Sequence, residues 1–246
     1  LRPQDVGKYA IVPGPKDRLE ALLKKLENPI KNFTFMEYSM FTGNYQGVRV
    51  TAINGGRFST DTSITTEVMC NAQIENIIRI GTCGALQPFL KPGHMIIATG
   101  AVRGEHTSEE LIDMEYPAAA DYRVVRALVD ACKKLGLPYH TGIIRTHDAF
   151  YLESPWAHGD YKERLKPWVD MGVLALDNES STLFVISAMN GVRAGTILSS
   201  LASERITRRF GVGVVTAVSV GMTAAALVGF SVSDSFWMLC LWAIPY

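Results

Sequence analysis

The sequence lacks an excess of charge of either sign. Its 24 Lys and Arg residues balance 24 Asp and Glu residues, so the formal net charge is zero. A neutral chain exerts no general attraction on nucleic acid or on an anionic membrane surface. We therefore expect no nucleic acid partner, and any anion that binds must be captured by a local arrangement of side chains.

Cysteine is also scarce. The chain has 4 cysteines in 246 residues, and none of them forms a CxxC pair. Their spacing provides neither a disulfide framework nor a set of metal ligands, so we expect free thiols and no bound metal. Residues 1–6 lack the apolar stretch of a secretory signal, which favours a cytoplasmic location.

Short apolar runs typical of strands alternate with helical patterns along the chain. Strands are predicted at Tyr9–Val12, Val48–Ile53, Ile77–Ile80, Met95–Thr99, Gly142–Arg145, Gly172–Ala175 and Gly195–Leu198. One helix face is predicted from Leu19 to Leu26, and a second helix between Asp121 as its cap and Gly136 as its end. This alternation predicts an α/β fold with a parallel or mixed sheet and sites at the carboxyl ends of strands, in a single domain spanning residues 1–246.

The C-terminal segment, residues 211–246, has an unusual composition. No charged residue occurs from Gly211 to Phe230, and Asp234 is the only charge after it. That length is sufficient to cross a bilayer, but the segment is rich in small and hydroxyl-bearing residues. A buried helix or a subunit contact is the favoured interpretation over a membrane segment, and an altered tail is a third possibility.

The most informative motif is Ile-Ile-Arg-Ile-Gly-Thr-Cys-Gly at residues 77–84. Arg79 lies in the predicted strand, and Thr82 lies in a predicted turn between Gly81 and Gly84. An arginine in an apolar strand is costly unless it meets an anion, and glycine turns let backbone amides surround one. The motif predicts a phosphate site, with an ion pair to a structural carboxylate as the alternative.

A second glycine turn lies at residues 13–18, directly before a predicted helix. It contains Gly14, and Arg18 follows one turn into the helix. Free amides at a helix N-terminus attract anions, so this turn is a candidate second half of the phosphate site.

Two later segments also follow predicted strands. The aromatic pair in Asp148–Tyr151 is suited to stacking on a flat heterocycle, although packing in the core explains it equally well. The carboxylates in Leu176–Ser181 are placed either to cap the next helix or to accept hydrogen bonds from the hydroxyls of a sugar.

With these motifs in this order, the chain resembles the nucleoside phosphorylase family that contains uridine phosphorylase and the hexameric purine nucleoside phosphorylases. The matching segments include residues 12–18, 41–47, 79–86, 93–103, 116–121, 148–151, 179–184 and 191–195. The block from Arg79 to Leu86 is most similar to the uridine phosphorylase branch.

The resemblance implies a three-layer α/β/α sandwich with a mixed, partly barrel-like central sheet. It implies reversible phosphorolysis of a nucleoside, with uridine favoured, to a free base and ribose 1-phosphate. Inorganic phosphate is the co-substrate and no cofactor is needed. It also implies a homo-oligomer built from dimers, up to a hexamer.

The resemblance assigns site residues as well. Phosphate binding is expected of Gly14, Arg18, Arg79 and Thr82, ribose binding of Asn178 and Glu179, base binding of Phe150, and catalysis of Arg79 together with Glu204 as an acid toward the leaving base.

Several family positions carry a different residue here. Met36 stands where the neighbouring subunit usually supplies an arginine to phosphate, and Arg57 is the candidate substitute. Ser154 and Trp156 replace the pair that reads uracil, so Ser154 is the remaining base-binding candidate. Asn178 replaces a methionine that packs on ribose. A purine nucleoside phosphorylase, a nucleosidase that uses water, and a catalytically impaired nucleoside-binding protein are therefore the alternatives.

Overall fold

A computed structural model describes residues 1–152, 154 and 156–200. Glu204 and the segment 211–246 lie outside the described residues. The strands are β1 Tyr9–Pro13, β2 Glu27–Phe35, β3 Tyr38–Tyr45, β4 Val48–Ile53, β5 Asn76–Ala85, β6 Met95–Gly104, β7 Ala118–Ala119, β8 Tyr139–His147, β9 Ala175–Asp177 and β10 Arg193–Ser200. The helices are the short 3-10 helix η1 Pro3–Asp5 and the α-helices α1 Lys16–Leu23, α2 Phe58–Asn71, α3 Tyr122–Leu135, α4 Tyr161–Asp170 and α5 Ser180–Met189.

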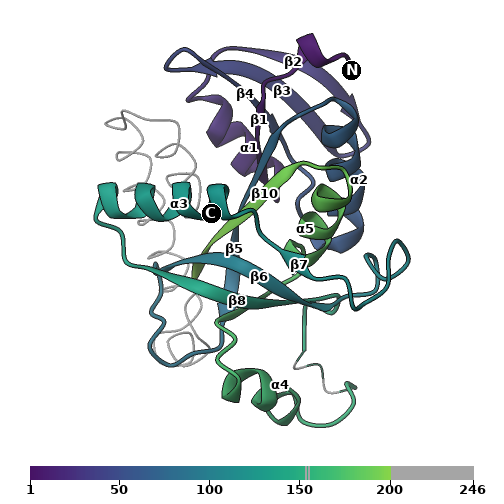
Figure 1. Ribbon diagram of the computed structural model, residues 1–246, viewed down its shortest axis with the longest axis vertical. Coiled ribbons are helices and arrows are strands. Elements are labelled where there is room, and N and C mark those ends of the chain that lie inside the picture. Colours follow the sequence, from purple (N-terminus) through teal and green to yellow (C-terminus); the bar gives the residue numbers. More distant parts are fainter. Residues whose placement is uncertain (153, 155, 201–246) are drawn as a thin grey trace.

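A closed ring of five strands forms one half of the sheet. The neighbours run β10-β6-β8-β9-β5, and β5 also pairs with β10, which closes the ring. The β10–β5 and β6–β8 pairs are parallel, whereas β10–β6 and β5–β9 are antiparallel. Figure 1 shows this barrel-like part below the extended part of the sheet. The predicted mixed, partly barrel-like sheet is confirmed.

The extended half of the sheet continues from β5 through β1, β4, β3 and β2. The strands β1, β4, β5 and β10 are parallel where they meet, so the carboxyl ends of β1 and β5 open on the same edge. Arg79 on β5 lies between Val12 of β1 and Thr196 of β10. The register therefore brings the two predicted halves of the phosphate site to neighbouring strands.

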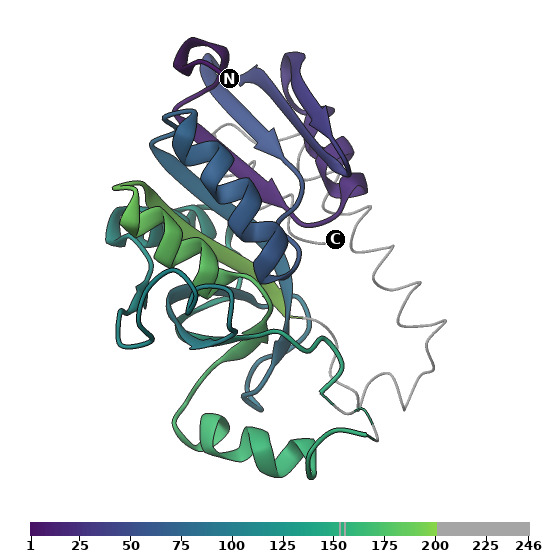
Figure 2. The same ribbon diagram turned by 90° about the vertical axis from the view of Figure 1, so that its right-hand side faces the viewer.

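Helices cover both faces of the sheet, which gives the three predicted layers. The apolar faces of α1 and α3 pack on one side, in the cluster that includes Leu19, Leu22 and Leu128. The helices α2 and α5 pack on the other side, in the cluster that includes Met69 and Phe184. Figure 2 shows α2 and α5 lying side by side across their face of the sheet.

The helix α3 begins and ends where the sequence predicts. The carboxylate of Asp121 accepts hydrogen bonds from the backbone nitrogens of Arg123 and Val124, at 2.8 and 3.4 Å. Gly136 ends the helix in the left-handed conformation, with φ of 65°. A side-chain cap and a C-terminal glycine satisfy backbone groups that the helix itself leaves unpaired.

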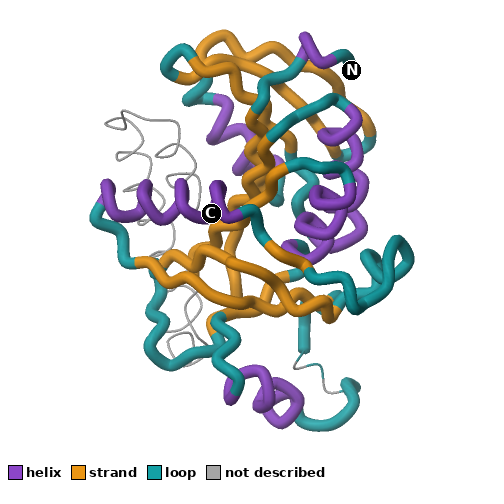
Figure 3. Tube along the Cα trace, viewed as in Figure 1, coloured by secondary structure: helices purple, strands orange, loops and turns teal. Residues whose placement is uncertain are grey.

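The structure corrects two predicted strand boundaries. Figure 3 shows the strands in orange and the helices in purple along the chain. The strand β5 does not end at Ile80, because Ile80–Cys83 pair with Ile197–Ser200 of β10, so Thr82 lies in a strand and not in a turn. The predicted strand Gly172–Ala175 is instead β9, Ala175–Asp177, whose residues pair with β5 and β8; Leu174, just before it, donates a single backbone hydrogen bond to Ile143 of β8 at 2.9 Å. None of the helices within the described ranges is long and apolar enough to cross a bilayer.

Candidate functional site

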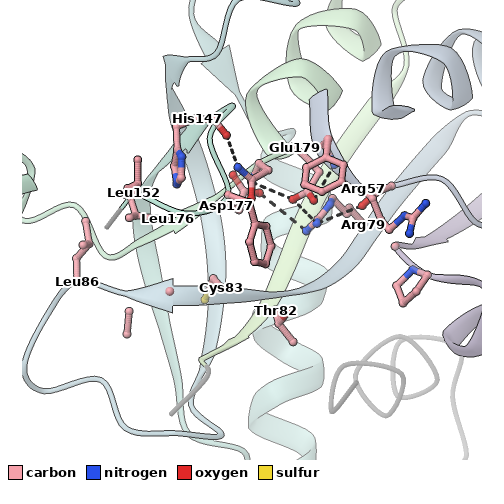
Figure 4. Close-up of a pocket in the computed structure, with 18 of the residues that line it drawn as sticks. Arg57, Arg79, Thr82, Cys83, Leu86, His147, Leu152, Leu176, Asp177 and Glu179 are labelled. Atoms are coloured by element: carbon pink, nitrogen blue, oxygen red, sulfur yellow. Dashed lines mark hydrogen bonds and ion pairs between the residues drawn. The ribbon is translucent and has the colours of Figure 1, made fainter. Parts of the chain in front are cut away.

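A cavity of about 480 Å³ opens at the carboxyl ends of β1, β5, β8 and β9. Its lining combines charged groups with an apolar wall. In Figure 4, Arg57, Arg79 and Glu179 lie on one side of the view, and Leu86, Leu152 and Leu176 lie on the other. The other charged or polar lining residues are Arg18, Thr82, His147, Tyr161, Asp177 and Asn178. The cavity is thus divided into a charged end and an apolar end.

Arg79 occupies the charged end and is only 4 % exposed. Its Nη2 forms an ion pair with Glu179 and donates a hydrogen bond to the carbonyl oxygen of Gly56 at 3.3 Å. Its Nη1 lies 3.9 Å from a carboxylate oxygen of Asp177. The Nε and Nη1 atoms have no hydrogen-bond partner within the described part of the chain. The guanidinium therefore meets structural carboxylates and still has unused donors for a ligand.

Arg18 lies on α1 and lines the same cavity. Burial, together with the weaker effect of repulsion from Arg79, lowers the pKa of Arg18 to about 10. The side chain still carries its charge at neutral pH. Because Arg18 and Arg79 repel each other, an anion bound between them would relieve an unfavourable interaction.

Glycines at the charged end make room for these arginines. A Cβ on Gly81 would lie 2.3 Å from Nη1 of Arg79, so no other residue type fits there without displacing the guanidinium. A Cβ on Gly14 would lie 3.1 Å from Cγ of Arg57. A Cβ on Gly84, in contrast, would meet no atom of the described residues within 4 Å. The sequence motif gives Gly81 and Gly84 equal weight, whereas the structure places the steric constraint at Gly81.

Arg57 and Thr82 complete the charged end. Both line the cavity, and the side chain of Arg57 is 48 % exposed. Its Nη2 lies 4.0 Å from Asp61, one helical turn further on in α2. An exposed pair at this distance is weak, so Arg57 is available to a ligand.

The carboxylates of Asp177 and Glu179 have different roles in the structure. Asp177 caps α5 by accepting from the backbone nitrogen of Ser180 at 3.0 Å, and it accepts from Oγ1 of Thr146 at 2.7 Å. Glu179 faces the cavity, where burial raises its pKa and the positive charge of Arg79 opposes that rise. Asp177 thus satisfies the first interpretation of this segment, a helix cap, whereas Glu179 lines the cavity and its contact with sugar hydroxyls stays a prediction.

The remaining predicted residues are placed unequally. Asn178 lines the cavity, but its amide nitrogen donates to the carbonyl oxygen of His147. Phe150 also lines the cavity and is 62 % exposed, in edge-to-face contact with Phe58. Ser154 is not among the lining residues of the described part, and Glu204 lies outside it.

His147, the last residue of β8, lines the cavity although its sequence context predicts no role for it. The side chain lines the apolar end of the cavity, is 6 % exposed, and has no hydrogen-bond partner for Nδ1 among the residues described. Burial lowers the pKa of His147, and the charge of Arg145 adds to that effect. A lone histidine with no metal-ligand spacing carries no signal in the sequence, and only the fold brings it to the cavity.

Comparison with known proteins agrees with this geometry. The family model described as the phosphorylase superfamily matches residues 8–207. The chain belongs to the phosphorylase superfamily. The match includes Glu204 and every cavity residue named above.

Individual relatives of this superfamily member cover most of its length. A uridine phosphorylase of Thermococcus kodakarensis is 32% identical over 247 residues, covering 98% of this chain and 85% of the relative. A guanosine phosphorylase of Halorubrum lacusprofundi is 33% identical over 193 residues, covering 78% of this chain and 77% of the relative. The crystal structure of a Vibrio fischeri uridine phosphorylase, complexed with 6-hydroxy-1-naphthoic acid, superposes with a TM-score of 0.83 at 25% identity and covers 98% and 93% of the two chains.

Proposed function

We propose that the protein is a nucleoside phosphorylase, with uridine as the favoured substrate. One observation carries this proposal: Arg18 and Arg79 lie on a single cavity beside the buried carboxylate of Glu179. Two guanidinium groups suit a phosphate dianion, and a fixed carboxylate suits the hydroxyls of a sugar. Membership of the phosphorylase superfamily and a uridine phosphorylase relative 32% identical over nearly the whole chain support the same reaction.

The reaction follows from this arrangement. A phosphate oxygen held by Arg18, Arg79 and Thr82 forms a bond to C1′ of the ribose. The glycosidic C–N bond breaks, its electron pair passes to the base, and the base takes up a proton. The sugar carries positive charge in the transition state, and a phosphate held beneath it both stabilises that charge and supplies the nucleophile in place. Phosphate is thus a substrate, and the scheme calls for no cofactor.

The choice of base is open between pyrimidine and purine. Two observations favour uridine: the block from Arg79 to Leu86 is most similar to the uridine phosphorylase branch, and the Thermococcus relative is a uridine phosphorylase. The Halorubrum relative, in contrast, is a guanosine phosphorylase. The apolar wall of Leu152, Leu165 and Leu176 supplies few groups that read the edge of uracil. A purine nucleoside is therefore the second candidate. Glu204 stays the predicted acid that protonates the leaving base, and Ser154 stays the predicted contact to the nucleobase.

The test is release of free base from uridine, inosine and guanosine, with and without inorganic phosphate. We expect release that requires phosphate and yields ribose 1-phosphate. Release at the same rate without phosphate would identify a nucleosidase instead. Binding of nucleoside without turnover in either condition would identify a binding protein.

We also propose that Arg57 is a third phosphate ligand in place of the charge absent at Met36. Its position on the charged end and its weak pair with Asp61 support this role. Arg57→Ala is expected to raise the KM for phosphate about tenfold, on the scale of one charged hydrogen bond. Arg126→Ala is the matched control, because Arg126 forms a similar i,i+4 pair with Asp130 on the surface of α3. An unchanged KM for phosphate in Arg57→Ala would contradict the role.

Three further expectations stay predictions. The first is a single domain spanning residues 1–246. The second is a homo-oligomer built from dimers, which the exposed apolar side chains of Ile30, Phe35 and Met36 near the free edge of the sheet support. The third is a cytoplasmic location.

A further inference from the structure

Phe58 has a backbone conformation that its residue type rarely adopts. It is the first residue of α2, and its φ is 60°, in the left-handed region. A side chain with a Cβ is strained there, and strain of this kind persists only where the surroundings hold it in place. The strain at Phe58 therefore calls for an interaction that fixes this residue.

That interaction is with the carboxylate proposed to bind ribose. The backbone nitrogen of Phe58 donates a hydrogen bond to Oε1 of Glu179 at 3.1 Å. The next residue, Ser59, donates from Oγ to the carbonyl oxygen of Asn178 at 2.8 Å. The beginning of α2 is thus tied to the segment that carries Glu179, and the left-handed turn at Phe58 aims its amide at the carboxylate.

The same turn presents the phenyl ring at the cavity. Phe58 lines the cavity and is 42 % exposed, although it is fully apolar. Its ring contacts the ring of Phe150 edge to face, with centroids 6.1 Å apart and planes at 79°. An aromatic ring left accessible beside a polar site indicates a surface that a ligand covers.

We propose that Phe58 is a nucleoside-binding residue, whose ring packs against the ribose between Glu179 and Phe150 while its amide orients the Glu179 carboxylate. The proposal rests on the nucleoside phosphorylase function stated above. Asn178 cannot supply this apolar contact, since its side chain is polar and its amide nitrogen is bound to His147. Ring contact on one face of the sugar excludes water from the reacting carbon and strengthens the ionic contacts around it.

The variant Phe58→Gly distinguishes the role of the Phe58 ring from the role of its backbone amide. Glycine adopts a φ of 60° without strain and keeps the amide that binds Glu179, so the variant removes only the ring. We expect the KM for the nucleoside to rise at least about tenfold, on the scale measured for aromatic contacts to nucleotides, with the KM for phosphate within about twofold of wild type. Phe58→Tyr keeps an aromatic ring, and its KM for the nucleoside is expected to stay close to the wild-type value.

Gln73→Gly is the matched control. Gln73 lies just beyond the other end of α2, is exposed, and has a φ of 62°, so the substitution relieves the same strain outside the cavity lining. Neither glycine variant is expected to lower the melting temperature, and Gln73→Gly is expected to leave both KM values unchanged.

An unchanged KM for the nucleoside in Phe58→Gly would overturn the proposal. Should the wild-type protein fail to turn over nucleosides, the proposed function is wrong, and titration calorimetry with uridine and guanosine then decides the role of the ring. Binding at least about tenfold weaker in Phe58→Gly than in Gln73→Gly would support it, and equal binding would overturn it.

Discussion

The buried ion pair between Arg79 and Glu179 offers a way to separate the structural and the chemical roles of one arginine. Arg79 is 4 % exposed and faces two carboxylates, those of Glu179 and Asp177. Arg79→Met removes the cation but keeps a side chain of similar length. Two carboxylates are then left without a counter-charge, and loss of one partner of a buried pair costs about 3–5 kcal/mol. We expect the free energy of unfolding to fall by that amount.

The double variant Arg79→Met with Glu179→Gln tests the cause of that loss. A neutral amide replaces the uncompensated carboxylate, while Asp177 keeps its hydrogen bonds from Ser180 and Thr146. Replacing both members of a buried pair by neutral groups is often close to neutral for stability. The double variant is therefore expected to regain more than half of the stability that the single variant loses.

Activity is expected to behave differently from stability. A hydrogen bond from a charged donor to the bound phosphate contributes about 1.5–3 kcal/mol, a factor of about 10–10² in affinity for phosphate and so in kcat/KM. We expect Arg79→Met to lower kcat/KM for phosphorolysis by at least that factor, and the double variant to remain equally inactive.

Urea denaturation measures the stabilities, and initial rates of base release at varied phosphate concentration measure the activities. Both are read at a temperature where every variant is folded. A double variant that recovered activity along with stability would refute the assignment, because Arg79 would then serve the fold alone. Wild-type rates in Arg79→Met would refute it as well.

Two further predictions concern the cavity wall. Gly81→Ala is expected to lower the affinity for phosphate at least about tenfold, because the new methyl group would lie 2.3 Å from Nη1 of Arg79. Gly84→Ala is the control in the same phosphate-dependent assay, because its methyl group would meet no atom of the described part of the chain within 4 Å. Burial lowers the pKa of His147 from 6.5, so between the lowered value and 6.5 the unfolded chain binds more protons than the folded chain. Stability is therefore expected to fall as the pH drops through that window, and urea midpoints between pH 7.5 and 5.5 should change less in His147→Gln than in wild type. A Gly81→Ala protein with unaltered phosphate affinity, or parallel pH profiles for wild type and His147→Gln, would contradict these two expectations.

Those parts of the fold that depend on local signals were predictable from the sequence. The helix α3 has a side-chain cap, an apolar stripe and a terminal glycine, and the structure confirms all three. The strand containing Arg79 was predicted from its apolar residues, but its true end was not. Its continuation through Thr82 depends on pairing with β10, which lies more than a hundred residues later and leaves no local signal.

The residues of the candidate site also fall into those with a local signal in the sequence and those without one. Arg79 carries charge inside an apolar strand and Arg18 follows a glycine turn at the start of a helix, so both have a local signal in the sequence. The role predicted for Glu179 came from the resemblance, because its segment alone fitted a helix cap equally well. Phe58 and His147 are ordinary residues in composition, and neither β2, β3 nor α2 was predicted as an element. Phe58 reaches the cavity because α2 packs against α5. Residues whose role depends on such packing require the three-dimensional structure.

The strand β5 belongs to both halves of the sheet, since it pairs with β1, β9 and β10. An anion bound by Arg79 would therefore contact the strand that joins the barrel to the extended part of the sheet. Its binding free energy would stabilise only the state in which the barrel and the extended part are both folded. Saturating phosphate should raise the melting temperature while unfolding remains a single transition, with no separate step for either half of the sheet.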